Sequence, residues 1–242
     1  MKNIETISVG ELAISNYRYA DIFMKYGIDF CCGGKKSLRD ACHNIESSLD
    51  EIISELNRAD DNGAVINEAD VSLDQLIDHI EDKHHTYVRE ALPILISYAD
   101  KVARAHGDKY PELLEIRGLL NVLENDLMPH LSKEEVILFP YIRQMLGDST
   151  RLALPIDTVF SPIEVMLKEH DRAGDIFKRI NELTGKYQLP SDACVSFKAF
   201  YRVLDEFEKD LYRHIHLENN ILFPKAIDLE NSLNTNINHN EN

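Results

Sequence analysis

The sequence predicts an all-α protein, and three observations lead to this prediction. Apolar residues recur at spacings of three and four over long stretches, whereas alternation with period two is almost absent. Helix-start signals precede these stretches. Two of the stretches also share one His-x-x-x-Glu-x-x-Ile-Leu-Phe-Pro motif, whose spacing of four places the histidine and the glutamate on one helix face.

Residues 1–59 predict a small helical N-terminal domain. Its first helix is marked by the apolar residues Leu12, Tyr17, Ala20 and Phe23. A loop over 26–34 follows this helix. Ser37 and Ser48 then begin capping-box-like patterns, which predict two short helices.

A linker, four long helices and a tail complete the predicted organisation. Residues 60–71 are polar and weakly patterned, as in a linker between domains. Residues 72–228 predict four helices that begin near Ser72, Pro111, Ser161 and Ser191. We expect the first of these helices to bend at Pro93. The Asn-rich residues 229–242 predict a disordered tail.

Charge and composition exclude several classes of function. The chain carries 26 Lys and Arg against 42 Asp and Glu, which gives a net charge of −16. Such a surface repels nucleic-acid phosphates and anionic lipids, so we expect neither a nucleic-acid nor a membrane partner. The sequence contains no apolar run long enough to span a bilayer and begins with no signal peptide. With only four cysteines, it predicts a cytoplasmic protein.

The repeated motif gives the strongest internal signal. One copy contains His130 and Glu134, and the other contains His214 and Glu218. Four residues of helix turn the chain by about 400°, so each pair lies stacked on one face. A further histidine precedes each copy by a similar separation. His85 lies 130 − 85 = 45 residues before His130, and His170 lies 214 − 170 = 44 residues before His214.

These residues predict a metal centre inside a four-helix bundle. A single His-x-x-x-Glu pair usually marks only a solvated helix face, but two matched copies favour metal ligands. Imidazole and carboxylate donors without thiolates suit iron or manganese more than structural zinc, and carboxylates from facing helices can bridge two ions. Of the two metals we favour iron. The sequence therefore predicts two iron ions held by six residues, namely His85, His130, Glu134, His170, His214 and Glu218.

The first ligand has an alternative in the adjacent His84. The apolar periodicity around residues 73–91 points His84 closer to the centre of the buried stripe. Alignment of the two halves instead matches His85 with His170 and leaves His84 opposite Glu169. The remaining histidines His79, His106 and His216 have no counterparts in the repeat, so we expect them on the surface or in supporting positions.

Together these motifs resemble the hemerythrin-like di-iron family for repair of iron centres. The Cys31-Cys32-Gly33-Gly34 element resembles the short ScdA-type N-terminal domain of that family, and the repeated helices resemble its di-iron domain. Motif by motif, the resemblance selects His85 as the first ligand. The sequence departs from the family pattern at Pro129, a proline inside a predicted helix that could change the direction of the His130 side chain.

The resemblance implies what the residues alone do not. It implies a hemerythrin-like four-helix bundle with an oxo- and carboxylate-bridged di-iron centre. It also implies a cytoplasmic role in repairing iron–sulfur clusters damaged by oxidative or nitrosative stress, with the damaged proteins as partners. Supply or exchange of iron would serve that role. A homodimer formed through the N-terminal domain stays open.

The adjacent Cys31 and Cys32 are candidate redox or iron-transfer thiols. Two glycines, two lysines and the helix start at Ser37 follow them, and such surroundings lower the pKa of a thiol. The alternative is that both side chains only fill a tight loop. Cys42 and Cys194 lie within helical patterns, so we expect both in the core.

Three other functions compete with cluster repair. A non-haem di-iron enzyme would reduce nitric oxide or dioxygen at open coordination positions. An oxygen carrier or sensor would bind dioxygen reversibly, although the cysteine-containing domain has no evident use in it. An acidic helical scaffold would leave the histidines without metal.

Overall fold

The computed structural model describes residues 3–43, 45, 47–60, 70–147 and 156–240. Most of the predicted linker, residues 61–69, lies outside the described residues. The chain divides into two compact units. The first comprises Met1–Asp78 with Arg213–Asn242, and the second comprises His79–Tyr212. Among the described residues no strand is present, and Ser8 and Ser37 form an isolated bridge.

The N-terminal part of the first unit is built from short helices. These are η1 (Ile4–Thr6), α1 (Val9–Ser15), α2 (Arg18–Tyr26), α3 (Leu38–Ala41) and α4 (Leu49–Asp60). Ser8 and Glu11 form a capping box at α1, and Ser37 caps α3 as predicted. Phe23 and Phe30 lie fully buried beneath these helices, with ring centroids 6.0 Å apart.

The single helix predicted around Leu12 and Phe23 is wrong, because the chain forms two helices there. Asn16 ends α1 in an extended conformation with a φ of −153°. Its side chain then accepts a hydrogen bond from the backbone N–H of Arg18 at 3.1 Å and donates to Asp60 at 2.9 Å. Asparagine favours such local bonds over helix continuation, so apolar spacing alone did not reveal the break.

The first unit also contains the C-terminal part of the chain. Helix α5 (Leu73–His79) belongs to it up to Asp78, and the end of α10 (Val195–Leu217) continues through the π-helical segment η5 (Glu218–Leu222) into α11 (Phe223–Asn240). Residues 229–240 are therefore helical where the sequence predicted a disordered tail. Extending an existing helix gains one hydrogen bond per added residue, which requires little apolar patterning.

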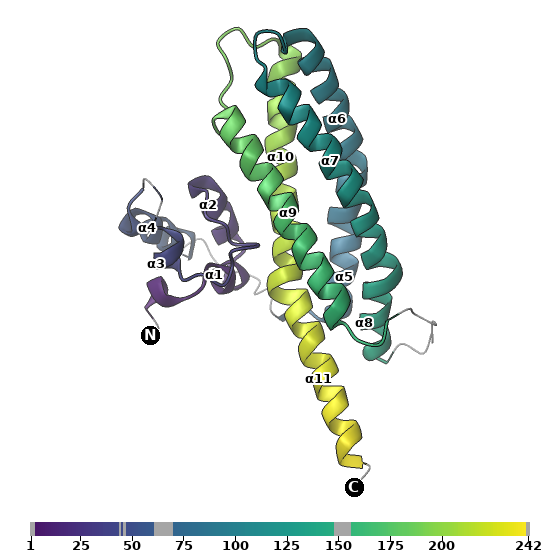
Figure 1. Ribbon diagram of the computed structural model, residues 1–242. Coiled ribbons are helices and arrows are strands. Elements are labelled where there is room, and N and C mark those ends of the chain that lie inside the picture. The colour runs from purple at the N-terminus through teal and green to yellow at the C-terminus, as the bar shows by residue number, and fades with distance from the viewer. Residues whose placement is uncertain (1–2, 44, 46, 61–69, 148–155, 241–242) are drawn as a thin grey trace. The chain divides into compact units, whose positions relative to one another are not determined.

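The second unit is a four-helix bundle within its described residues (Figure 1). Its long helices are α6 (Thr86–His106), α7 (Glu112–Lys133), α9 (Phe160–Thr184) and the part of α10 up to Tyr212. Phe207 of α10 packs on Phe177 of α9 at 6.0 Å and near Tyr87 of α6 at 6.1 Å between ring centroids. These aromatic contacts close the bundle around a buried apolar core.

The helices of the bundle contain π-helical segments that the sequence did not predict. Segment η3 (Ile80–His85) precedes α6, and η4 (Glu134–Leu138) joins α7 to α8 (Phe139–Met145). The helix predicted to begin near Ser72 is therefore π-helical over Ile80–His85, and its continuation α6 remains α-helical through Pro93. Gly185 ends α9 in the left-handed region, with a φ of 57°. Among the described residues, no helix combines the length and apolar character needed to cross a bilayer.

Candidate metal centre

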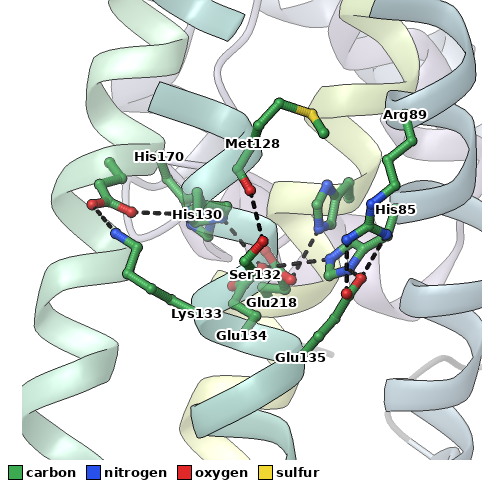
Figure 2. A network of polar contacts seen from close by, with 12 residues as sticks. His85, Arg89, Met128, His130, Ser132, Lys133, Glu134, Glu135, His170 and Glu218 are labelled. Atoms are coloured by element: carbon green, nitrogen blue, oxygen red, sulfur yellow. Dashed lines mark hydrogen bonds and ion pairs between the residues drawn. The ribbon is translucent and has the colours of Figure 1, made fainter. Parts of the chain in front are cut away.

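His85 is the last residue of η3 and is fully buried. Its Nε2 lies 3.4 Å from Oε2 of Glu134, and its Nδ1 lies 2.7 Å from Oε1 of Glu135. Arg89 donates to both oxygens of Glu135 at 2.7 Å, and Figure 2 shows both side chains converging on this carboxylate. A carboxylate that accepts from Nδ1 fixes the ring and leaves Nε2 as the donor to a metal.

The Glu135 carboxylate stays ionised because of these contacts. Burial raises its pKa, but the hydrogen bonds from Arg89 and His85 outweigh burial and hold the pKa below the usual range. The neighbouring His84 is also buried, yet its Nδ1 pairs with Oδ1 of Asp210 at 3.0 Å. His85, rather than His84, therefore faces Glu134.

His130, Glu134 and His170 form the other part of the cluster in this unit. The Nε2 of His130 lies 3.3 Å from Oε2 of Glu134 and 3.1 Å from Nε2 of His170. Ligand atoms of these three residues all lie within 4.8 Å of one another. Each side chain is at most 2% exposed, so the cluster is shielded from bulk solvent.

Glu169 orients His130 in the way that Glu135 orients His85. Its Oε2 lies 2.8 Å from Nδ1 of His130, and its other oxygen accepts from Lys133. The hydrogen bond to His130 lowers the pKa of Glu169, and the hydrogen bond to Lys133 lowers it further. Together they outweigh partial burial, which raises the pKa, and the resulting pKa is about 2. Pro129 does not displace His130, because α7 continues through it to Lys133.

The second copy of the motif lies in the first unit. Nε2 of His214 is 3.0 Å from Oε1 of Glu218, and both residues are completely buried. His214 lies in the continuous helix α10, two residues after Tyr212, where the second unit ends. The spacing of four thus produces the expected stacked pair in both copies.

The π-helical segments share one relation to these residues. Glu134 is the first residue of η4, Glu218 is the first residue of η5, and His85 is the last residue of η3. In both copies the phenylalanine N–H bonds to the glutamate carbonyl five residues back, from Phe139 to Glu134 and from Phe223 to Glu218. A proline follows each phenylalanine, and its ring disfavours regular α geometry one turn earlier.

The arrangement fits a metal cation. Neither carboxylate oxygen of Glu134 has a hydrogen-bond partner among the described residues, although the side chain is fully buried. Burying a carboxylate without compensation costs several kcal/mol, which a bound cation would offset. The two histidines at 3.3 and 3.4 Å face this carboxylate with nitrogen atoms. Such nitrogen and oxygen donors suit iron.

The other histidines occupy three different environments. His79 is exposed, and His106 is half-buried with Nε2 at 3.1 Å from Sγ of Cys194. His216 is buried, stacks near Phe30 at 5.2 Å between ring centroids, and has a pKa lowered by burial to about 4. His216 therefore supports the N-terminal loop rather than lying on the surface.

Two sequence predictions about cysteines are wrong. Cys194 is exposed at the start of α10 rather than in the core, whereas Cys42 is buried as expected. The pKa of Cys31 is raised, not lowered, because of its hydrogen bond to Cys32 and its burial. Asp29 also places negative charge beside the thiol, at 3.4 Å from Sγ. The positive charges nearby in sequence do not dominate this loop.

Sequence reasoning missed the side chains that support the histidines and the cysteine loop. Glu135 and Arg89 lie around His85, while Asn219 and Asn220 donate to the carbonyl oxygen of Cys31 at 3.4 and 3.3 Å. The repeat contained one signal that these positions have different supporting roles, because the two copies differ directly after the glutamate. Glu-Val follows Glu134, but Asn-Asn follows Glu218.

The fold and this donor set define a class of helical proteins with a buried histidine–carboxylate cluster. Residues 76–226 match the hemerythrin HHE cation binding domain, and residues 5–60 match ScdA_N, a domain of unknown function. The chain belongs to the hemerythrin HHE family.

Similarity to named proteins extends over nearly the whole chain. The iron–sulfur cluster repair protein YtfE of Enterobacter sp. (strain 638) is 39% identical over 219 residues, which cover 90% of this chain and 96% of that protein. The iron–sulfur cluster repair protein YtfE of Escherichia coli O81 (strain ED1a) shows the same identity and coverage. Both domains of the present chain thus have counterparts in these proteins.

Proposed function

We propose that this protein repairs iron–sulfur clusters damaged by oxidative or nitrosative stress, through a di-iron centre that supplies or exchanges iron. The observation that carries the proposal is the buried Glu134 carboxylate, which faces two histidine nitrogens and lacks a hydrogen-bond partner among the described residues. Similarity over 90% of the chain to proteins named for iron–sulfur cluster repair supports the function itself.

The proposed centre holds two iron ions per chain. The residues that would hold these ions are the six that the repeat predicts, namely His85, His130, Glu134, His170, His214 and Glu218. Glu134 and Glu218 would supply the carboxylate ligands, as glutamates do in other helical bundles. The centre, when bound, supplies ferrous or ferric iron and open coordination positions.

The residues around the ligands hold the centre in one geometry. Glu135 and Glu169 accept from the Nδ1 side of His85 and His130, so each ring keeps Nε2 available for metal. Both carboxylates stay ionised at neutral pH, because their hydrogen bonds to histidine, arginine or lysine lower their pKa. Full burial excludes bulk water from the ligands.

We propose Cys31 and Cys32 as thiols for iron transfer to the damaged client. Support comes from their positions in the N-terminal loop, where Cys32 is partly accessible and the two sulfur atoms lie 3.9 Å apart. Clients are proteins with damaged iron–sulfur clusters. We further propose a cytoplasmic location, which agrees with four cysteines that are all free thiols in the described chain.

Restoration of a damaged client tests the function. An enzyme with a nitric-oxide-damaged [4Fe–4S] cluster should recover activity when incubated with the iron-loaded protein. The variant with Cys31→Ser and Cys32→Ser should keep its iron yet restore far less activity, while Cys194→Ser serves as the matched control. Rapid reduction of nitric oxide or dioxygen without any recovery of the client would favour the enzyme alternative and refute repair.

A further inference from the structure

The loop between α2 and α3 brings three metal-binding groups together. Sγ of Cys31 lies 3.9 Å from Sγ of Cys32 and 3.4 Å from Oδ1 of Asp29. Ligand atoms of all three residues lie within 4.8 Å of one another. We propose that Asp29, Cys31 and Cys32 form a separate binding site for one divalent transition-metal ion, in addition to the histidine–carboxylate centre.

The distances match the edges of a tetrahedral coordination shell. Metal–sulfur bonds of about 2.3 Å in tetrahedral geometry place two sulfur atoms about 3.8 Å apart. With a metal–oxygen bond of about 2.0 Å, sulfur and oxygen lie about 3.5 Å apart. The observed separations of 3.9 and 3.4 Å are therefore close to those that one shared ion needs.

The loop is held in this shape by bonds that do not consume the sulfur atoms. Oδ1 of Asp29 accepts from the backbone N–H groups of Cys31 and Cys32 at 3.2 and 2.9 Å. Asn220 donates to the carbonyl oxygens of Phe30 and Cys31 at 3.2 and 3.3 Å. Because a carboxylate has about four lone-pair sites, the two sites on Oδ2 of Asp29 are not used by these backbone N–H groups. A preorganised donor set loses little entropy on binding.

Gly33 allows the backbone to pass close to Asp29. A Cβ atom at this position would lie 3.0 Å from both the carbonyl oxygen and Oδ2 of Asp29. The backbone therefore passes closer to Asp29 than most side chains allow.

Accessibility suits an ion that exchanges. Asp29 is exposed and Cys32 is half-buried, whereas Cys31 is buried, so one side of the site faces solvent. Three protein donors leave a fourth position for another ligand. Binding releases the two thiol protons to water.

The proposal that this ion is iron on its way to a client protein rests on the proposed repair function. The proposal that the loop binds an ion does not rest on it. The two statements are therefore tested separately. Cobalt(II) is a suitable probe, because thiolate ligands give it near-ultraviolet charge-transfer absorption that histidine and carboxylate ligands do not give.

The binding test uses the reduced full-length protein with its histidine–carboxylate centre already loaded with iron. Anaerobic titration with cobalt(II) should add about one ion per chain with thiolate charge-transfer absorption. Cys31→Ser and Cys32→Ser should each weaken this absorption and lower the affinity at least about tenfold. Asp29→Asn keeps an acceptor for the two backbone N–H groups, so it should lower affinity but retain the thiolate absorption.

Cys194→Ser provides the control, because Cys194 is exposed and lies 3.1 Å from Nε2 of His106 without belonging to this loop. Its affinity and absorption should equal those of the unaltered protein. Absence of thiolate absorption in the unaltered protein would overturn the proposed site. Absorption that persists when Cys31 and Cys32 are both replaced, and disappears with Cys194→Ser, would overturn it as well.

The client assay then separates the two proposals. Asp29→Asn with weakened cobalt binding and impaired client recovery would support the site and its role in transfer. If the unaltered protein restores the client but binds no cobalt at this loop, the repair function stands and the loop site is refuted.

Discussion

The two copies of the repeated motif share a histidine and a glutamate four residues apart but differ in the residues directly after the glutamate. His130 with Glu134 and His214 with Glu218 are buried pairs at 3.3 and 3.0 Å. After Glu134 comes Glu135, which accepts from His85 and Arg89 inside the bundle. After Glu218 come asparagines that donate to the carbonyl oxygen of Cys31.

This difference shows how one local motif serves two neighbourhoods. The spacing of four and the following π-helical turn are repeated, because they depend only on the chain within one helix. The residues directly after the glutamate lie in different surroundings in the two copies, so their identity depends on what surrounds them. At the second of these positions Val136 is 66% exposed, whereas Asn220 hydrogen bonds to the N-terminal loop.

Removal of either carboxylate should produce the largest effect. If Glu134 and Glu218 are equivalent bridging ligands, Glu134→Ala and Glu218→Ala should each reduce bound iron from about two ions per chain to less than one. The double variant should bind no dinuclear iron. Metal analysis with visible absorption before and after reduction measures this.

Glu90→Ala on the exposed side of α6 is the matched control and should retain all its iron. Loss of iron from only one of the two single variants would show that the copies are not equivalent. A full metal complement in the double variant would refute the ligand scheme.

Residues directly after the two glutamates should affect iron unequally. Glu135→Ala removes the partner of His85 Nδ1 and should lower iron affinity by about 10- to 100-fold. Asn219→Ala, at the equivalent position of the second copy, should leave iron affinity unchanged. Competition with a chelator measures both affinities, and equal losses would contradict the difference between the copies.

Gly34→Ala tests how tightly the second copy packs against the N-terminal loop. The added Cβ would lie 2.5 Å from Oδ1 of Asn220 and 2.7 Å from the carbonyl oxygen of Phe30. We expect the free energy of unfolding to fall by about 2 kcal/mol, the cost typical of overpacking. Urea denaturation measures the change.

Gly118→Ala within α7 is the control with the opposite sign. Among the described residues, no atom outside the neighbouring backbone of α7 lies within 4 Å of a Cβ atom there, so the substitution should stabilise the helix by about 0.5–1 kcal/mol. Destabilisation by both substitutions would indicate a general intolerance of glycine replacement rather than contact with Asn220.

Asn220→Ala should have the smallest of the four effects. It removes the hydrogen bonds to the carbonyl oxygens of Phe30 and Cys31, at a net cost of about 1 kcal/mol. Val136→Ala, its counterpart in the first copy, should change the free energy of unfolding by less than about 0.5 kcal/mol. Urea denaturation with intact iron content compares them, and equal costs would remove the proposed asymmetry.

Regular features of the fold could be predicted from the sequence because they depend on neighbours along the chain. Ser37 and Gly185 mark helix ends in the structure as their residue types suggest. The break at Asn16 was missed, because the contact that accompanies it is with Asp60, 44 residues away. The apolar periodicity favoured His84 over His85, because it reports only burial, and both rings are buried in the structure.

The sequence by itself determined the all-helical class, the stacked His–Glu pairs and the resemblance that points to iron, because each depends on spacing within one helix or on motif similarity. Only the tertiary structure decided that His85 faces Glu134 and that Glu135 and Glu169 orient histidines. It also reversed the expected pKa shift of Cys31. These properties arise between segments distant in sequence, where burial and facing charges outweigh local pattern.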